Sequence, residues 1–413
     1  MRTKPDLSYA IGLPPEKAIE YFKSKGYALS WNWHDTWQEA HAKAFTVAKA
    51  MRMDVLQDIH DMVQKALDEG ITLQQFKQEL TPKLQAKGWW GRKVIGDETG
   101  AQAVQLGSPR RLRTIYQTNL QTAYMAGRYK DFMNNVDDRP DWMYVAIMDR
   151  RTRPTHAALN GKVFRYDDPF WDSFYPPNGW NCRCRVRALS DGDLKSKGIT
   201  PESSAGKLST EGKLVSKRTG ELREVTAYTD PVTGMKIAPD VGWSYNPGRA
   251  AWQPDLDRYA YKVAKQYVGG GLTGPDFTRF FQGKTGGNFP VAVLDAELMQ
   301  PIGTKSQTVY LSDETLAKQK GEVEGVPGHP DLTLEEYQQL PDIISPTANV
   351  ILQDSDVTLV FVKRAGRYYQ AVVKTTRSGE SNFLTSFRRV DDIDSEVGRL
   401  KRKKGVKVIK DEL

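Results

Sequence analysis

Two cysteines and a histidine are the residues of this sequence best suited to bind a metal ion. Cys182 and Cys184 are the two cysteines of the chain, and one residue separates them. A disulfide between them would close a strained ring, whereas two thiolates this close can both reach one metal ion. His156 lies upstream in the same turn-rich segment, and Zn²⁺ prefers such a mixed sulfur and nitrogen set. We therefore predict a structural zinc site, with Asp149 or a water molecule as the fourth ligand.

A second interpretation of the same residues needs no metal. Zinc modules commonly place two residues between paired cysteines, and this chain has one. The alternative is two small buried thiols in a sheet, with His156 hydrogen-bonded to the backbone of a loop. Metal analysis of the purified protein distinguishes the two.

A small α+β unit has to position these residues. Trp142–Met148 is short, apolar and rich in strand-forming residues, so we predict a buried strand there. Residues 163–166 and 184–188 are the expected partner strands. Ser108-Pro109 predicts the start of a long helix, because proline at the first helical position loses no hydrogen bond. The sheet should pack on this helix.

The chain before this unit reads as helical. Asp35 and Gln38 resemble a capping box, and apolar residues then recur in steps of three and four up to Gly70, which predicts one long helix. Thr72 and Gln75 repeat the capping pattern, so a second helix is expected from Thr72 to Gly88, and residues 91–107 are expected to form a loop. We assign residues 1–107 to a helical N-terminal region and residues 108–190 to the α+β unit.

The second half is expected to contain a connector and a further domain. Residues 191–290 are rich in Gly, Ser, Thr, Lys and Pro, which is typical of a connector or an extended arm. Glu221–Tyr228 and Thr233–Ile237 could form a hairpin within it. Residues 291–413 alternate short helical and strand patterns, with strands expected at 350–353, 358–363, 368–375 and 383–389. The predicted fold class is multidomain α+β, with an antiparallel sheet in the last domain.

Composition sets limits on the class of protein. The chain is 39% hydrophobic and 27% charged, which is ordinary for a globular protein. No apolar run is long enough for a membrane span, and no secretory signal is apparent. Two cysteines indicate a reducing compartment, so the terminal Lys-Asp-Glu-Leu is read as a coincidence rather than a retention signal. The net charge of +8 suits work near nucleic acid, although solubility alone would also explain it.

Three stretches of the turn-rich segment resemble a family signature. They are Asp149-Arg-Arg-Thr-Arg-Pro-Thr-His156, Leu159-Asn-Gly161 and Tyr175-Pro-Pro-Asn-Gly-Trp-Asn-Cys-Arg-Cys-Arg185. They look like the signature of the phage Mu F-like minor head proteins of tailed bacteriophages, and the helical hairpin before them is also similar to that family.

This resemblance implies a minor capsid protein that acts in head morphogenesis at the portal vertex, and that in some members influences DNA packaging or delivery. It implies the portal protein and the major capsid protein as partners, with packaged DNA as a further contact. The expected location is the capsid interior or the portal vertex of the virion, and the host bacterial cytoplasm during assembly. This part of the resemblance brings no catalytic residue.

The order of elements from Val309 to Val390 resembles phage versions of the barnase/EndoU/colicin/RelE-like nucleases. Such enzymes cleave RNA without a metal, and the chemistry needs an acid, a base and cations that stabilise the phosphorane. The candidate catalytic residues are His329, Lys374, Thr385, Ser386 and Arg388. The alternative is a set of ordinary solvated strand residues and a histidine held in a proline-containing loop.

These observations leave three hypotheses open. The first is the minor capsid protein, with no cofactor besides structural zinc. The second is a phage-delivered endoribonuclease acting on host RNA, with the N-terminal half as an adaptor; whether the chain is an enzyme stays open. The third is a zinc-dependent DNA-binding protein unrelated to phages. The basic residues Lys401, Arg402, Lys403 and Lys404 could contact nucleic acid, or form a solvated and partly disordered end.

Overall fold

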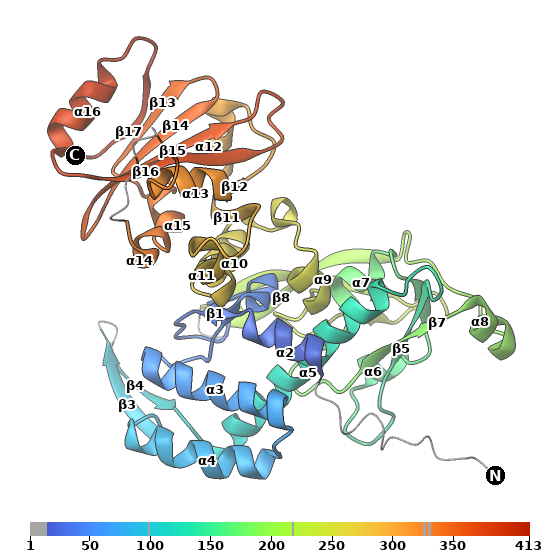
Figure 1. The fold of residues 1–413 in the computed structure, drawn as a ribbon. Helices are drawn as coiled ribbons and strands as arrows, with labels where there is room; N and C mark the ends of the chain where they lie inside the picture. The colour runs from blue at the N-terminus through green and yellow to red at the C-terminus, as the bar shows by residue number, and fades with distance from the viewer. Residues whose placement is uncertain (1–14, 98–99, 217–218, 325–327, 329–331) are drawn as a thin grey trace. The chain divides into compact units, whose positions relative to one another are not determined.

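The computed structural model of this chain describes residues 15–97, 100–216, 219–324, 328 and 332–413. Its contacts divide the chain into two units (Figure 1). Unit 1 comprises Met1–Lys23, Leu29–Ala42 and Thr46–Pro254, and unit 2 comprises Ser24–Ala28, Lys43–Phe45 and Asp255–Leu413. Both contain helices and sheets, so the predicted α+β class is confirmed. Among the described residues, no helix combines the length and apolar character needed to cross a membrane.

Unit 1 begins with helices that pack side by side. α2 spans Glu16–Lys23, α3 spans Met53–Glu69 and α4 spans Leu73–Ala86. α3 and α4 lie next to each other (Figure 1), which confirms the predicted pair of helices. Thr72 caps α4 in the predicted capping box with Gln75.

One predicted helix is much shorter in the structure. The expected helix up to Gly70 begins only at Met53; before it lie a 3₁₀ helix at Gln38–Ala42 and the short strand β2 at Ala44–Phe45. The physical reason is the backbone, because Gln38 and Lys49 adopt φ angles of +41° and +66°. A continuous α-helix cannot run through residues with such φ angles, so the apolar spacing before Met53 does not reflect one long helix.

The segment predicted as a loop at 91–107 is a hairpin. β3 (Arg92–Asp97) pairs antiparallel with β4 (Gly100–Gln105). The prediction was wrong because the hydrophobic pattern is weak here; Val94, for example, is 73% exposed. Backbone pairing holds these strands together, and Val104 of β4 is buried.

The long helix α5 spans Pro109–Met133, starting where the sequence predicts. Ser108 precedes it in an extended conformation, and its hydroxyl accepts a hydrogen bond from the backbone N–H of Arg111. Leu112, Ile115, Ala123 and Ala126 are buried on its inner face.

We expect Ser108→Ala to lower the free energy of unfolding by about 1 kcal/mol, because a helix N–H then loses its acceptor. Urea denaturation measures the loss. Ser108→Asp should keep most of the stability, since a carboxylate caps equally well; equal losses in both variants would contradict a capping role.

The sheet predicted after α5 is present. Its strand order is β6-β5-β7, with β5 at Asp141–Val145, β6 at Val163–Arg165 and β7 at Arg185–Leu189. Three short helices, α6 (Pro154–Ala158), α7 (Phe170–Phe174) and α8 (Asp191–Lys197), lie between or after the strands.

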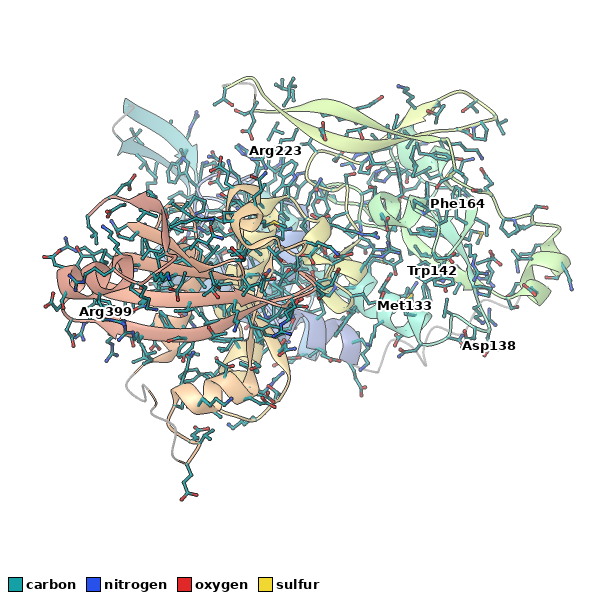
Figure 2. The ribbon with its side chains drawn as sticks, turned by 90° about the horizontal axis from the view of Figure 1, so that it is seen from above. Met133, Asp138, Trp142, Phe164, Arg223 and Arg399 are labelled. Atoms are coloured by element: carbon teal, nitrogen blue, oxygen red, sulfur yellow. The ribbon has the colours of Figure 1, made fainter. Side chains whose placement is uncertain are left out.

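An aromatic core joins this sheet to α5. Trp142 of β5 is fully buried and lies within 6 Å of the rings of Tyr129, Trp171 and Tyr175. Figure 2 labels Trp142 and Phe164 among the side chains of this region. The same buried cluster includes Cys182 and Cys184, so the aromatic core packs against the turn-rich segment that contains them.

The boundary between the units falls inside the predicted connector 191–290, after Pro254. β9 (Glu221–Thr229) pairs with β10 (Lys236–Ile237), which confirms the predicted hairpin, and with β8 (Leu208–Ser216). Tyr228 and Ile237 belong to the aromatic core cluster. α9 (Pro247–Trp252) completes unit 1, so the first part of the predicted connector packs within this unit rather than forming a free arm.

Unit 2 is built on one seven-stranded sheet of order β11-β12-β16-β15-β14-β13-β17. The predicted strands are β13 (Val350–Ser355), β14 (Thr358–Ala365), β15 (Arg367–Thr375) and β16 (Asn382–Val390), which form the expected antiparallel meander. β11 (Asn288–Val293), β12 (Thr308–Ser312) and β17 (Lys407–Asp411) complete the sheet.

Short helices surround this sheet. They are the 3₁₀ turns at Leu256–Arg258 and Gln300–Ile302, α10 (Tyr261–Leu272), α11 (Pro275–Phe281), α12 (Ala296–Met299), α13 (Asp313–Gln319), α14 (Leu334–Tyr337), α15 (Leu340–Ile343) and α16 (Ile393–Lys401). The short strand β1 (Gly26–Tyr27) pairs with β2 in the same unit. The alternative of a solvated and partly disordered end does not describe Lys407–Asp411, because this stretch forms β17, which pairs antiparallel with β13.

Candidate metal centre

The three residues predicted as metal ligands come together in the structure. His156 lies on α6, Cys182 in the irregular segment between α7 and β7, and Cys184 directly before β7. The Nδ1 atom of His156 is 3.7 Å from Sγ of Cys182 and 3.4 Å from Sγ of Cys184. One ligand atom from each residue lies within 4.8 Å of the others, and all three residues are buried.

Local backbone features bring the two cysteines to the same side. Asn181 has a φ of +58°, a left-handed conformation that asparagine tolerates better than most residues. Its position directly before Cys182 reverses the chain between Trp180 and the thiols. Pro154 opens α6, where a proline costs no hydrogen bond. The turn residues noted in the sequence thus position the histidine and the thiols.

The two thiols influence each other's ionisation. The pKa of Cys184 is lowered to about 7, chiefly because the Cys182 thiol hydrogen-bonds to it, with a further contribution from Tyr144. The same bond and burial raise the pKa of Cys182. The pair therefore releases its first proton more readily than an ordinary thiol and holds the second more tightly.

A buried tyrosine and asparagine stand behind the thiols. The hydroxyl of Tyr144 donates to Oδ1 of Asn178 at 2.9 Å and also interacts with Cys184. Nδ2 of Asn178 donates to the carbonyl of Ser173. The sequence analysis did not single out Tyr144; its signal is the alternation with Trp142 along β5, which places both side chains on the buried face.

An arginine occupies the far side of the imidazole. Nη1 of Arg153 is 3.5 Å from Nε2 of His156 and 3.1 Å from a carboxylate oxygen of Asp240. Its Nη2 donates to the carbonyl of Trp180. Gly179 leaves room for this arrangement, since a Cβ there would come within 2.4 Å of both Asp240 and Arg153. Nothing in the sequence marked Asp240, which lies far along the chain.

Asp149, named as a fourth ligand, has a different partner. Both its carboxylate oxygens accept hydrogen bonds from Arg183, at 2.6 and 2.7 Å. This bond holds the pKa of Asp149 well below its usual range. The carboxylate serves an ion pair between two segments of the loop, which leaves the cluster with three protein ligands.

The candidate catalytic residues of the last domain are spread along β15 and β16. Lys374 and Thr385 are exposed, and Thr385 is the extra residue of a bulge between the strands. Ser386 lies opposite Val372 in the strand pair, and Arg388 lies opposite Gln370. His329 lies outside the described residues.

Arg388 is held by other protein groups. Its guanidinium donates to Oε1 of Gln370 at 2.7 Å and to Glu396 of α16 at 2.5 Å. These bonds link Arg388 of β16 to β15 and to α16, which is a structural role. Of the four basic residues predicted to contact nucleic acid, two form ion pairs within the chain: Lys401 with Asp411 and Lys403 with Asp354. Arg402 and Lys404 are exposed.

Sequence reasoning missed a buried ion pair in unit 2. Glu336 is 8% exposed and receives two hydrogen bonds of 2.7 Å from Arg389, and one of 2.9 Å from the Tyr369 hydroxyl. The Arg389 guanidinium is the main reason why the pKa of Glu336 is lowered to about 2. The capping box of α14, in which Glu336 bonds to Thr333, was the available signal.

Comparisons with known proteins agree with the resemblance seen in the sequence. Residues 57–187 match the family described as "Phage Mu protein F like protein". The chain is 52% identical over 253 residues to the "Putative capsid assembly protein F" of Escherichia phage Mu, covering 60% of this chain and 58% of that protein. It is 45% identical over 230 residues to the "Mu-like prophage FluMu F protein" of Haemophilus influenzae, covering 55% of each.

The chain thus matches less than two thirds of the length of these relatives. No solved structure matches it.

Proposed function

Because residues 57–187 place this chain in the Phage Mu protein F-like family, we propose that it acts in the assembly of a bacteriophage head. The observation that carries this proposal is the 52% identity to a putative capsid assembly protein. The finer parts of the proposal are a position at the portal vertex, contacts with the portal and major capsid proteins, and assistance to DNA packaging or delivery.

A surface pocket in unit 1 supports a protein partner. The pocket has a volume of about 560 Å³ and lies between the C-terminal part of α5 and strands β5 and β7. Its lining consists of four arginines, one aspartate, one asparagine and five apolar residues: Arg128, Arg139, Arg185, Arg187, Asp131, Asn135, Phe132, Met143, Val145, Val186 and Ala188. Apolar side chains together with several arginines are typical of a surface that binds another protein. A surface that binds only phosphate would need the arginines but not the apolar side chains. We propose that it receives an acidic segment with apolar side chains from another head protein.

Removal of the gene from the encoding phage or prophage tests the proposed function. We expect lysates without mature heads and at least a tenfold loss of infectious particles, with recovery when the wild-type chain is supplied in trans. The chain itself should be present in purified particles. Normal heads in its absence would contradict the proposal.

The pocket is tested in the same complementation. Arg185→Glu combined with Arg187→Glu should fail to restore infectivity, because two charges are reversed on a surface that requires positive charge. The control is Arg165→Glu; Arg165 is exposed, pairs with Asp167 and does not line the pocket. Circular dichroism checks that both variants fold. Equal complementation by the two would show that the pocket has no partner.

The nuclease alternative is decided by Lys374→Ala. This exposed side chain is a candidate only for RNA cleavage, so a head assembly protein should tolerate its loss. If the variant chain fails to complement, and the wild-type chain cleaves RNA while the variant does not, the endoribonuclease replaces the assembly role.

A further inference from the structure

The His156, Cys182 and Cys184 cluster has the dimensions of a metal site. In a tetrahedral zinc site, Zn–S bonds of about 2.3 Å and Zn–N bonds of about 2.05 Å place nitrogen and sulfur about 3.5 Å apart. The two observed nitrogen–sulfur distances are 3.4 and 3.7 Å, on either side of that value. Both sulfurs approach the same nitrogen, Nδ1, as binding to a common ion requires.

Hydrogen bonding alone explains this arrangement less well. An imidazole Nδ1 carries at most one proton, which can be directed at one sulfur, and thiols are weak partners in any case. With two buried thiols beside one ring nitrogen, only one of them can share a proton with Nδ1 at a time. One cation satisfies all three ligand atoms at once.

The ligand types select the kind of metal. Two thiolates and an imidazole suit Zn²⁺ and exclude the hard cations Mg²⁺ and Ca²⁺, which take oxygen ligands. The cluster is buried, with Cys184 2% and His156 6% exposed. Such burial suits a structural ion.

We propose that Nδ1 of His156 and Sγ of Cys182 and Cys184 bind one Zn²⁺ ion, which fastens α6 to the start of β7. Binding displaces the two thiol protons into solvent. A water molecule is the fourth ligand, because the two nearby carboxylates already have partners. Asp149 pairs with Arg183, and Asp240 pairs with Arg153.

Arg153 and Tyr144 contact the three proposed ligands without binding the ion themselves. Zinc at Nδ1 places a proton on Nε2, which then faces Nη1 of Arg153 at 3.5 Å. Both groups would then be donors, so this contact has to lengthen when zinc binds, while Asp240 and the carbonyl of Trp180 remain acceptors for Arg153. Tyr144 lies beside Cys184 and orients its sulfur.

The full-length chain, purified under reducing conditions, tests the site. Elemental analysis should find one zinc per chain, and Co²⁺ in its place should give the charge-transfer absorption of cobalt–thiolate bonds. Cys182→Ser, Cys184→Ser and His156→Asn should each reduce bound zinc to less than a tenth. The control is His34→Asn, since His34 lies outside the cluster and pairs with Glu221; it should retain one zinc.

Tyr144→Phe distinguishes a residue that orients a ligand from the ligands themselves. It should retain one zinc but bind it roughly 10–100-fold more weakly, as measured by competition with a chelator. If the cysteine variants do not fold, the cobalt spectrum of the wild-type chain remains a direct test. Wild-type protein that holds no zinc, shows no cobalt–thiolate band and has two freely reactive thiols would overturn the proposal. That result would leave the proposed head assembly role intact, because the latter rests on the family match.

Discussion

Trp142→Ala is expected to lower the free energy of unfolding by about 3–5 kcal/mol, as measured by urea denaturation. Trp142 is fully buried and touches the aromatic rings of Tyr129, Trp171 and Tyr175. Truncation removes one of the two fully buried tryptophans, Trp142 and Trp171, from the core that joins α5 to the sheet β6-β5-β7. The rigid rings around it cannot move in to fill the space, so the cost should lie at the upper end for a core substitution.

Trp142→Phe is the matched control. Among the described residues, the indole N–H of Trp142 has no hydrogen-bond acceptor. Phenylalanine removes this unsatisfied group while keeping a ring in place, so the two effects partly offset each other and the loss should stay below about 1.5 kcal/mol. Similar losses for Ala and Phe would show that the core contact is not what Trp142 contributes.

Arg389→Ala is expected to cost about 3–5 kcal/mol, because it leaves Glu336 buried without its cation. Glu336 is 8% exposed and receives two hydrogen bonds from Arg389. Arg399→Ala is the control. Arg399 also pairs with a glutamate, Glu396, but its side chain is 55% exposed, so its loss should cost no more than about 1 kcal/mol. Thermal and urea unfolding measure both.

The same ion pair predicts a pH dependence. The pKa of Glu336 is about 2 in the folded chain and 4.5 for an ordinary glutamate. The stabilisation, about 3 kcal/mol for a shift of this size, is therefore complete above pH 4.5 and is lost as the pH falls towards 2. Arg389→Ala should flatten this part of the stability curve. An unchanged pH dependence in the variant would contradict the assignment to Glu336.

The sequence alone was sufficient wherever a local feature specifies the structure. Ser108-Pro109 predicted the start of α5, Thr72 and Gln75 predicted the cap of α4, and regularly spaced strand patterns predicted β13 to β16. Each depends on neighbours only a few residues away, so it can be read without knowing the fold. The wrong predictions came from patterns without that support. The apolar spacing before Met53 continued through Gln38 and Lys49, whose φ angles no helix accepts.

For the candidate metal centre, the sequence predicted the proposed ligands but not the residues around them. His156, Cys182 and Cys184 stand out by residue type, and the turn residues between them made their convergence predictable. Only the tertiary structure shows that Asp149 pairs with Arg183 instead, and that Tyr144, Asn178 and Asp240 surround the cluster. The same holds for Glu336 and Arg389, which are brought together from a helix and a distant strand. Sequence patterns record which residues are available, but the partners of a polar group are decided by long-range packing, because burial forces each such group to find whichever partner the fold places beside it.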